Sequence, residues 1–333
     1  MKPAISFLGA PLSWPLVIAG AAIGAALLAI PLLFDPYQTL LFSYGLVFAI
    51  AALGFNLLLG YTGLTSFGHS AYFGVGAYTV AFMVKYFGIT SMEVHLLAGI
   101  GVSVLLSGLF GFVCVRYTRI FFSILTLALS QVIWSLAFKF FWVTGGTDGI
   151  RVPRPTLLGG AIKFSGGGAF LEFVRSYYYY VLVLFVVCVA VMWLIVHSPF
   201  GKALQAIRDN ETRAEFVGVR VWHYRWMAFL ISGVFTGIAG VLWVPLNGLT
   251  TPDVLFWPFS GEIVFMTVLG GFRNFTGPII GAIMFNYLKT YSIAVTEYWQ
   301  FLLGGVLLVM VMVLPGGIVG TVTQVAAKLR KES

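Results

Sequence analysis

Groups that could carry out covalent chemistry are sparse in this chain. Its four histidines stand at positions 69, 95, 197 and 223, and they form neither an HExxH pattern nor part of a paired-carboxylate spacing. Cys114 and Cys188 lie within or at the end of apolar runs and have no neighbour at a metal-ligand spacing. We therefore expect no catalytic residues, no metal site and no cofactor, and we interpret the chain as a non-enzyme.

The sequence also lacks a phosphate-binding loop. Gly201-Lys202 is followed by Ala203, and no glycine stands five residues before Gly201, so the pattern GxxxxGK[ST] is not met. If ATP energises this protein, a separate chain must supply the ATPase.

Polar side chains beside helix-breaking glycines form the first candidate site, in GFNLLLGYTGLTSFGHSAYFGVGAY at 54–78. Broken helices at membrane depth are tolerated where protein or a water-filled cavity satisfies the backbone, and in transporters they often mark the pathway. We predict that this stretch lines a translocation route, through Asn56, Gly63, Thr65, Ser66, Gly68 and His69. Alternatively, the glycines serve tight packing or a turn. The second glycine-rich stretch, 268–282, allows the same two interpretations. Arg273 stands where a small residue would be expected, which weakens the pathway interpretation there.

The second candidate site is the longest polar interruption, at 197–225, which holds five of the 19 basic residues. Ser198 can cap a helix and Pro199 suits its first turn. One apolar face is expected, made by Phe200, Ala203, Leu204 and Ile207 and, beyond a break, by Phe216 and Val219, with Gly218 as the stop. This predicts a short amphipathic helix and a second partial turn outside the membrane. An ordinary basic cytoplasmic loop is the alternative.

Composition decides which elements must position these residues. The chain has 333 residues, of which 60% are hydrophobic and only 9% charged, against about 25% charged in soluble domains. We conclude that the fold is all-α and polytopic in a membrane. The net charge of +8 is explained by basic cytoplasmic loops and needs no nucleic acid.

About 20 apolar residues cross a bilayer, and on that rule we predict about ten transmembrane helices, with eight or nine possible. They lie near 14–34, 38–59, 71–87, 95–115, 120–142, 177–196, 226–246, 259–271, 276–294 and 299–318. Pairs of glycines four residues apart, such as Gly233 with Gly237 and Gly277 with Gly281, favour close helix packing. The chain 1–333 is expected to form a single membrane domain.

Lysine and arginine predict the orientation. With both termini in the cytoplasm, the basic residues of 197–225, together with Arg116, Arg119, Arg273 and those of both tails, face inward, as the positive-inside rule expects. The loop 144–176 is then external, and we expect an ordered surface that meets another protein. Glu262 would lie near the outer interface, where a proton-coupling role is an alternative to a structural one.

Four motifs in order resemble the branched-chain amino acid permease family of ABC importers, and most resemble its LivM-like members. They are the 54–78 stretch, TGGTDGI at 144–150, SPFGKALQAIRDNETRAEFVGV with the RWMAFLISGVFTGIAGVLW that follows it, and VLGGFRNFTGPIIGA. The resemblance runs from about 51 to 315. The loop departs from the general importer pattern, which begins Glu-Ala-Ala six residues before a glycine, because Thr212, Arg213 and Ala214 stand there.

The resemblance implies a membrane-spanning permease subunit of the bacterial inner membrane that translocates branched-chain or hydrophobic amino acids. It implies a second permease, expected to be a different chain, two ATP-binding subunits and an external solute-binding protein. The loop at 197–225 would dock on the ATPase through Gly201, Arg208, Asn210, Glu211, Ala214, Glu215 and Gly218. Related permeases carry urea, short amides or small carboxylates. Urea carriers typically have asparagines after the paired glycines, whereas Thr147-Asp148 here favours an amino acid.

Overall fold

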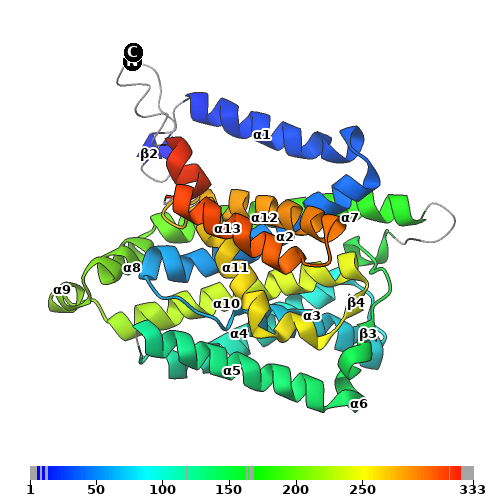
Figure 1. The fold of residues 1–333 in the computed structure, drawn as a ribbon, viewed down its shortest axis with the longest axis horizontal. Coiled ribbons are helices and arrows are strands. Elements are labelled where there is room, and N and C mark those ends of the chain that lie inside the picture. Colours follow the sequence, from blue (N-terminus) through cyan, green and yellow to red (C-terminus); the bar gives the residue numbers. More distant parts are fainter. Residues whose placement is uncertain are drawn as a thin grey trace.

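The computed structural model describes residues 6–7, 10–11, 14–117, 119–162, 164, 169–314 and 316–323. The fold is all-α, as predicted (Figure 1). Its long helices are α1 (Trp14–Leu33), α2 (Pro36–Asn56), α3 (His69–Phe87), α4 (Met92–Cys114), α5 (Arg119–Lys139), α7 (Ala169–His197), α10 (Val221–Asn247), α11 (Trp257–Gly270), α12 (Gly277–Val295) and α13 (Trp299–Val313).

Short elements connect these helices. They are the π-helix η1 (Leu57–Thr62), α6 (Phe141–Thr144), α8 (Pro199–Asp209), α9 (Glu211–Phe216), and the 3-10 turns η2 (Gly146–Asp148), η3 (Leu158–Gly160) and η4 (Pro252–Leu255). Two antiparallel pairs of two-residue strands complete the described chain, β1 (Ser6–Phe7) with β2 (Ala10–Pro11) and β3 (Ile150–Arg151) with β4 (Leu249–Thr250).

Each of the ten predicted apolar segments overlaps one of the long helices. The largest difference is at α7, which begins at Ala169 rather than near 177. Glu172 and Arg175 lower the hydropathy of its first turns without preventing helix formation, so the residues 169–176 that were expected to end the external loop are helical.

Among the described residues, six helical segments are long and apolar enough to cross a membrane: Pro36–Thr62, Met92–Cys114, Ile120–Lys139, Ala169–His197, Val221–Asn247 and Trp299–Thr323. By contrast, α11 has 14 residues, or about 21 Å at the usual rise, which is shorter than a hydrocarbon core of about 30 Å. The figure of ten crossings stays a prediction.

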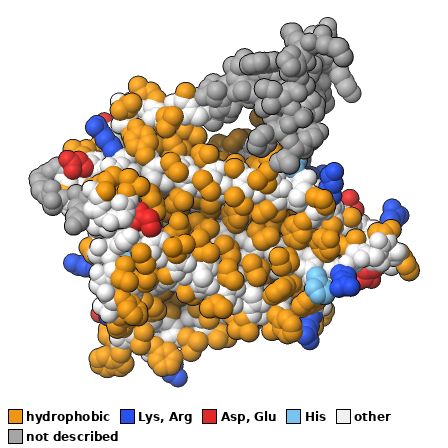
Figure 2. All heavy atoms as spheres, turned by 180° about the vertical axis from the view of Figure 1, so that it is seen from behind, with side chains coloured by type: hydrophobic (Ala, Val, Ile, Leu, Met, Phe, Trp, Pro, Cys, Tyr) orange, Lys and Arg blue, Asp and Glu red, His pale blue; other side chains and the backbone are white. Residues whose placement is uncertain are grey.

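In the most apolar stretch of each spanning segment, the share of residues that are buried differs. It is 83% for the segment of α2 and 67% for that of α10, but a third or less for those of α4, α5 and α7. The central helices are therefore α2 and α10, and α4, α5 and α7 are peripheral. Figure 2 shows one side wall of the molecule, where hydrophobic side chains form a broad band and most charged side chains lie toward its two ends.

Glycines let the central helices approach closely, as the four-residue spacing predicted. A Cβ on Gly233 or Gly237 would collide with the side chain of Ser107 or Ser103 in α4, and one on Gly240 would collide with the carbonyl of Phe73 in α3. The Gly277 and Gly281 pair lies in the same way against the end of α11. Gly233, Gly237 and Gly240 thus let α10 pack onto α3 and α4 with no space for a side chain between them.

The peripheral helix α1 contains Pro31 in its interior. A proline has no backbone N–H, so the carbonyl four residues earlier, that of Leu27, lacks its usual helical donor. The hydroxyl of Tyr178 in α7 donates to this carbonyl at 2.7 Å. A side chain of α7 thus satisfies the backbone group that Pro31 leaves free.

The two ends of the bundle differ. In Figure 1, α8 and α9 lie at one end, and α6, β3 and β4 lie at the other. At the second end β3 pairs with β4, and Thr156 pairs with Ser91, so much of the loop after α6 is ordered, as expected. The basic residues of the two tails, which entered the orientation argument, lie outside the described residues, as does Lys163 of the loop after α6; the tail residues are Lys2, Lys328, Arg330 and Lys331.

Candidate functional site

The polar loop between α7 and α10 folds as the sequence predicted, into one short helix and a second, shorter one. The Ser198 hydroxyl accepts a hydrogen bond from the Gly201 amide, and Pro199 is the first residue of α8. Leu204 and Ile207 are buried, which anchors α8 to the bundle. Gly218 ends the pair of helices at a φ of +87°, a conformation that favours glycine.

One part of that prediction is wrong. Phe216 was expected on the buried apolar face, but its side chain is 86% exposed. The break at Asn210 turns α9 so that Ala214, rather than Phe216, packs with Ile207 and Val221.

The seven predicted ATPase-docking residues divide into three groups. Gly201, Asn210, Ala214 and Gly218 build the loop: a Cβ on Gly201 would collide with the Val196 carbonyl, and the Asn210 side chain caps α9 at 2.9 Å from the Arg213 amide. Arg208 and Glu211 bind other parts of the chain. Glu215 is exposed on α9. Their docking role stays a prediction.

Arg208 and Glu211 make the charged contacts of this loop. Arg208 donates from Nη1 to the Gly60 carbonyl in η1, and from Nε and Nη2 to Asp209 Oδ1 at 3.3 and 3.2 Å. Arg225 of α10 donates to both carboxylate oxygens of Glu211, at 2.6 and 2.8 Å. The side chain of Arg225 is 8% exposed and that of Glu211 42%. Bidentate pairs of this kind fix geometry as well as charge.

The first glycine-rich stretch is a broken helix, as the sequence indicated. α2 passes into the π-helix η1, which ends at Gly63 with a φ of +72°. An extended segment, 64–68, then leads to α3. Two bonds attach this segment to α5: Ser123 Oγ donates to the Thr65 carbonyl at 2.6 Å, and the Phe67 amide donates to Thr126 Oγ1 at 3.2 Å.

The structure separates the six predicted pathway residues into two sets. Asn56, Ser66 and His69 are buried, and a Cβ on Gly68 would lie 2.7 Å from the Thr126 carbonyl. His69 Nε2 is 2.8 Å from Ser232 Oγ of α10, and its imidazole packs edge-on against Phe55 and Tyr72. This set holds the break inside the bundle.

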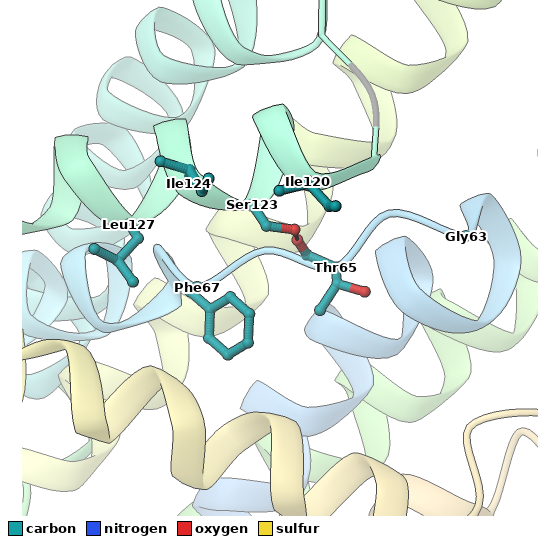
Figure 3. A pocket seen from close by; sticks show the side chains of 7 residues that line it. All are labelled: Gly63, Thr65, Phe67, Ile120, Ser123, Ile124 and Leu127. Carbon is teal, nitrogen blue, oxygen red and sulfur yellow. Dashed lines mark hydrogen bonds between the residues drawn. The ribbon is translucent and has the colours of Figure 1, made fainter.

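Gly63 and Thr65 form the other set, because both line a groove of about 540 Å³. In Figure 3 the wall that contains Gly63 and Thr65 also carries Phe67. The other wall is α5, with Ile120, Ser123, Ile124 and Leu127. Sequence reasoning missed the α5 residues because they lie in an ordinary apolar helix. It also passed over Phe67, which lies inside the predicted 54–78 stretch, because only polar residues and glycines were selected there. The arrangement is an apolar groove with a few hydroxyl and backbone polar groups, and it can hold a small solute without reacting with it.

Glu262 of α11 pairs with Lys289 of α12, whose ammonium lies 2.6 and 2.7 Å from the two carboxylate oxygens. The two side chains are 19% and 27% exposed. A partner of opposite charge offsets the cost of holding a carboxylate between apolar helices. Within the described residues, no group of three or more His, Cys, Asp or Glu side chains could hold a metal ion.

Comparison with known proteins adds the family. The family described as "Branched-chain amino acid transport system / permease component" matches residues 37–311. The chain is 26% identical over 290 residues to the high-affinity branched-chain amino acid transport system permease proteins LivM of Salmonella typhimurium and of Escherichia coli, covering 82% of this chain and 68% of each relative. It is also 26% identical over 141 residues to the autoinducer 2 import system permease protein LsrC of Photorhabdus laumondii, covering 40% of this chain and 42% of that relative. No solved structure matches.

The family match spans all the long helices except α1, and it includes both the broken helix and the polar loop. Several apolar helices of spanning length agree with a multi-pass protein of the inner membrane. The relatives named above are transport permeases rather than enzymes. The chain therefore belongs to the permease family of branched-chain amino acid transport systems.

Proposed function

We propose that this chain is the permease subunit of an ABC importer for branched-chain or other hydrophobic amino acids. The observation that carries the proposal is the family match over residues 37–311, together with the LivM relatives. The absence of a phosphate-binding loop in the sequence favours two separate ATP-binding subunits as the energy source.

The groove on α5 is proposed as one wall of the solute route. Its apolar residues suit a hydrophobic side chain, and the Thr65 hydroxyl beside them can hydrogen-bond a polar head. The groove opens on the surface of this chain, so a second permease subunit would close its open side. The buried residues Asn56, Ser66, Gly68 and His69 would then act on the route by holding Gly63 and Thr65 in place.

The remaining partners follow from the two ends of the bundle. We propose that α8 and α9 dock on the ATPase in the cytoplasm, with both termini on that side. The ordered loop after α6 would face outward and meet a solute-binding protein. Glu215 and the exposed Phe216 of α9 are the side chains most available to the ATPase.

A different solute is the main alternative within the same family. The similarity to an autoinducer 2 permease covers about two fifths of this chain, so membership of the family alone does not identify the solute. A urea, amide or small carboxylate carrier would keep the same groove and the same loop. Amino acid uptake is favoured because the LivM relatives cover twice as much of the chain.

The experiment fills the groove in the complete importer. Ile124→Trp adds bulk at an exposed groove position on α5, and Val187→Trp adds the same bulk at an exposed position of α7 outside the groove. We expect the first to abolish uptake of radiolabelled leucine into proteoliposomes with the ATPase still bound, and the second to leave uptake unchanged. Equal uptake by the two variants would contradict the route. Uptake of urea but not leucine by the unsubstituted complex would favour the alternative solute.

A further inference from the structure

We infer that Arg208 is a positioning residue, which ties the broken inner end of α2 to α8 and so links the polar loop to the groove. The inference rests on the proposed function, in which α8 and α9 receive the motion of the ATPase. It differs from the sequence prediction, in which Arg208 contacts the ATPase directly.

The hydrogen bonds of Arg208 point into the chain. All three of its guanidinium nitrogens have acceptors within this protein, namely the Gly60 carbonyl and Asp209 Oδ1. Gly60 lies 148 residues earlier in the sequence, inside the π-helix. A hydrogen bond from a charged donor is stronger than a neutral one, so this contact fixes the distance between α8 and the break.

Gly63 makes room for that contact. The Cγ of Arg208 lies 2.9 Å from the position that a Cβ on Gly63 would occupy. Gly63 also has a φ of +72°, where residues other than glycine are strained. Any larger side chain at this position would push the Arg208 stem away from Gly60.

A polar cavity separates the two elements beside the arginine. It has a volume of about 420 Å³, with Thr62, Gly63 and Leu64 on one wall and Asn210, Glu211 and Thr212 on the other. The end of α8 and the break face each other across this space, and the hydrogen bond from Arg208 to the Gly60 carbonyl joins them beside it. A displacement of α8 therefore reaches residues 60–63 through the guanidinium.

The break passes the displacement on to the groove. The segment 64–68 that follows Gly63 is bonded to α5 through Ser123 and Thr126. Thr65 and Ser123 both line the groove, one on each wall (Figure 3). The path from α8 to the groove thus contains one charged side chain, one short segment and two hydrogen bonds.

Hydrogen exchange of the purified permease tests the tie without any transport. The reporters are the amides of Leu64, Phe67 and Gly68, which are bonded to Leu58 O, Thr126 Oγ1 and Ser66 Oγ. We expect Arg208→Ala to raise the exchange of the peptide covering 60–68 about tenfold, the factor that loss of one charged hydrogen bond represents. The matched control is Arg116→Ala, which removes the same charge from an exposed position just after α4, outside the two docking helices.

A second measurement places the tie in the transport cycle. In the complete importer, Arg208→Ala should keep the ATPase bound and active while uptake per ATP hydrolysed falls, and Arg116→Ala, which lies outside α8 and α9, should leave that ratio unchanged. Unaltered exchange with a lost ATPase would assign Arg208 to the docking surface and overturn the inference. Equal exchange in both variants would overturn it as well. Raised exchange in α4 or α7 of Arg208→Ala would mark general unfolding and also count against a local tie. Failure of uptake by the unsubstituted complex would refute only the proposed function, since the exchange result stands alone.

Discussion

The pair between Arg225 and Glu211 gives the sharpest stability prediction, because its two members are buried to different extents. The side chain of Arg225 is 8% exposed, whereas that of Glu211 is 42% exposed. Removing Glu211 leaves a buried cation with no partner. Removing Arg225 leaves a carboxylate that water can reach. Glu211→Ala should therefore be the more harmful substitution, and Arg225→Met in the same chain should restore most of the loss.

The expected magnitude lies between two limits. Breaking a fully buried ion pair costs about 3–5 kcal/mol, and breaking an exposed one about 0.2–1 kcal/mol. With one member buried and the other half exposed, we expect Glu211→Ala to cost about 2–3 kcal/mol, which is roughly a 30- to 150-fold rise in the open population of α9. The double variant Glu211→Ala, Arg225→Met should lie within about 1 kcal/mol of the parent, because apolar replacement of a buried pair is often neutral.

Thiol labelling of α9 measures this opening. Ala214 is 3% exposed against Ile207 and Val221, so a cysteine placed there in a Cys-free background reacts only when α9 opens. The labelling rate, divided by the rate in unfolded protein, gives the open fraction. Glu215→Ala is the control, because it removes an exposed acid from the same helix. The reasoning is refuted if Glu211→Ala labels no faster than Glu215→Ala, or if Arg225→Met makes Glu211→Ala label faster still.

Two further predictions concern orientation and packing. Single cysteines at Thr156 and Asn210, in intact cells, should be labelled by an impermeant reagent at Thr156 and protected at Asn210, and the reverse result would invert the proposed orientation. Gly240→Ala should lower the yield of folded permease and its unfolding temperature, because the added methyl collides with the Phe73 carbonyl and overpacking costs about 1–3 kcal/mol. The control Gly261→Ala, where a Cβ meets nothing within 4 Å, should match the parent. Equal yields of the two variants would show that α10 can shift away from α3.

Local chemistry made much of the fold predictable from sequence. The capped start of α8 at Ser198 and Pro199, and the glycine stop after α9 at Gly218, depend on residues a few positions apart, and the structure agrees with both. The ten apolar segments were found by hydropathy for the same reason. The start of α7 was misjudged because Glu172 and Arg175 lie in its first two turns, and hydropathy does not distinguish the end of a helix from the end of its apolar part.

Contacts between distant residues explain what was missed. The partners of Arg208 and Glu211 are Gly60 and Arg225, and no local pattern pairs them. Both residues were expected to contact the ATPase because the family resemblance implies that this loop docks there. The groove was half predicted for a similar reason. Glycines marked Gly63 and Thr65, but the α5 wall has the composition of an ordinary apolar helix.

The proline in α1 has a consequence for how an almost wholly apolar helix finds its place. Lipid tails and leucine side chains are chemically alike, so such a helix has little reason to prefer one rotation over another. Pro31 creates one unpaired carbonyl, and in a medium without water that carbonyl strongly favours the rotation and depth at which the Tyr178 hydroxyl can reach it. The proline therefore helps to set the position of α1, because it leaves a backbone acceptor that the Tyr178 hydroxyl binds. In a chain of this composition, a missing hydrogen bond can direct assembly as well as a charged side chain can.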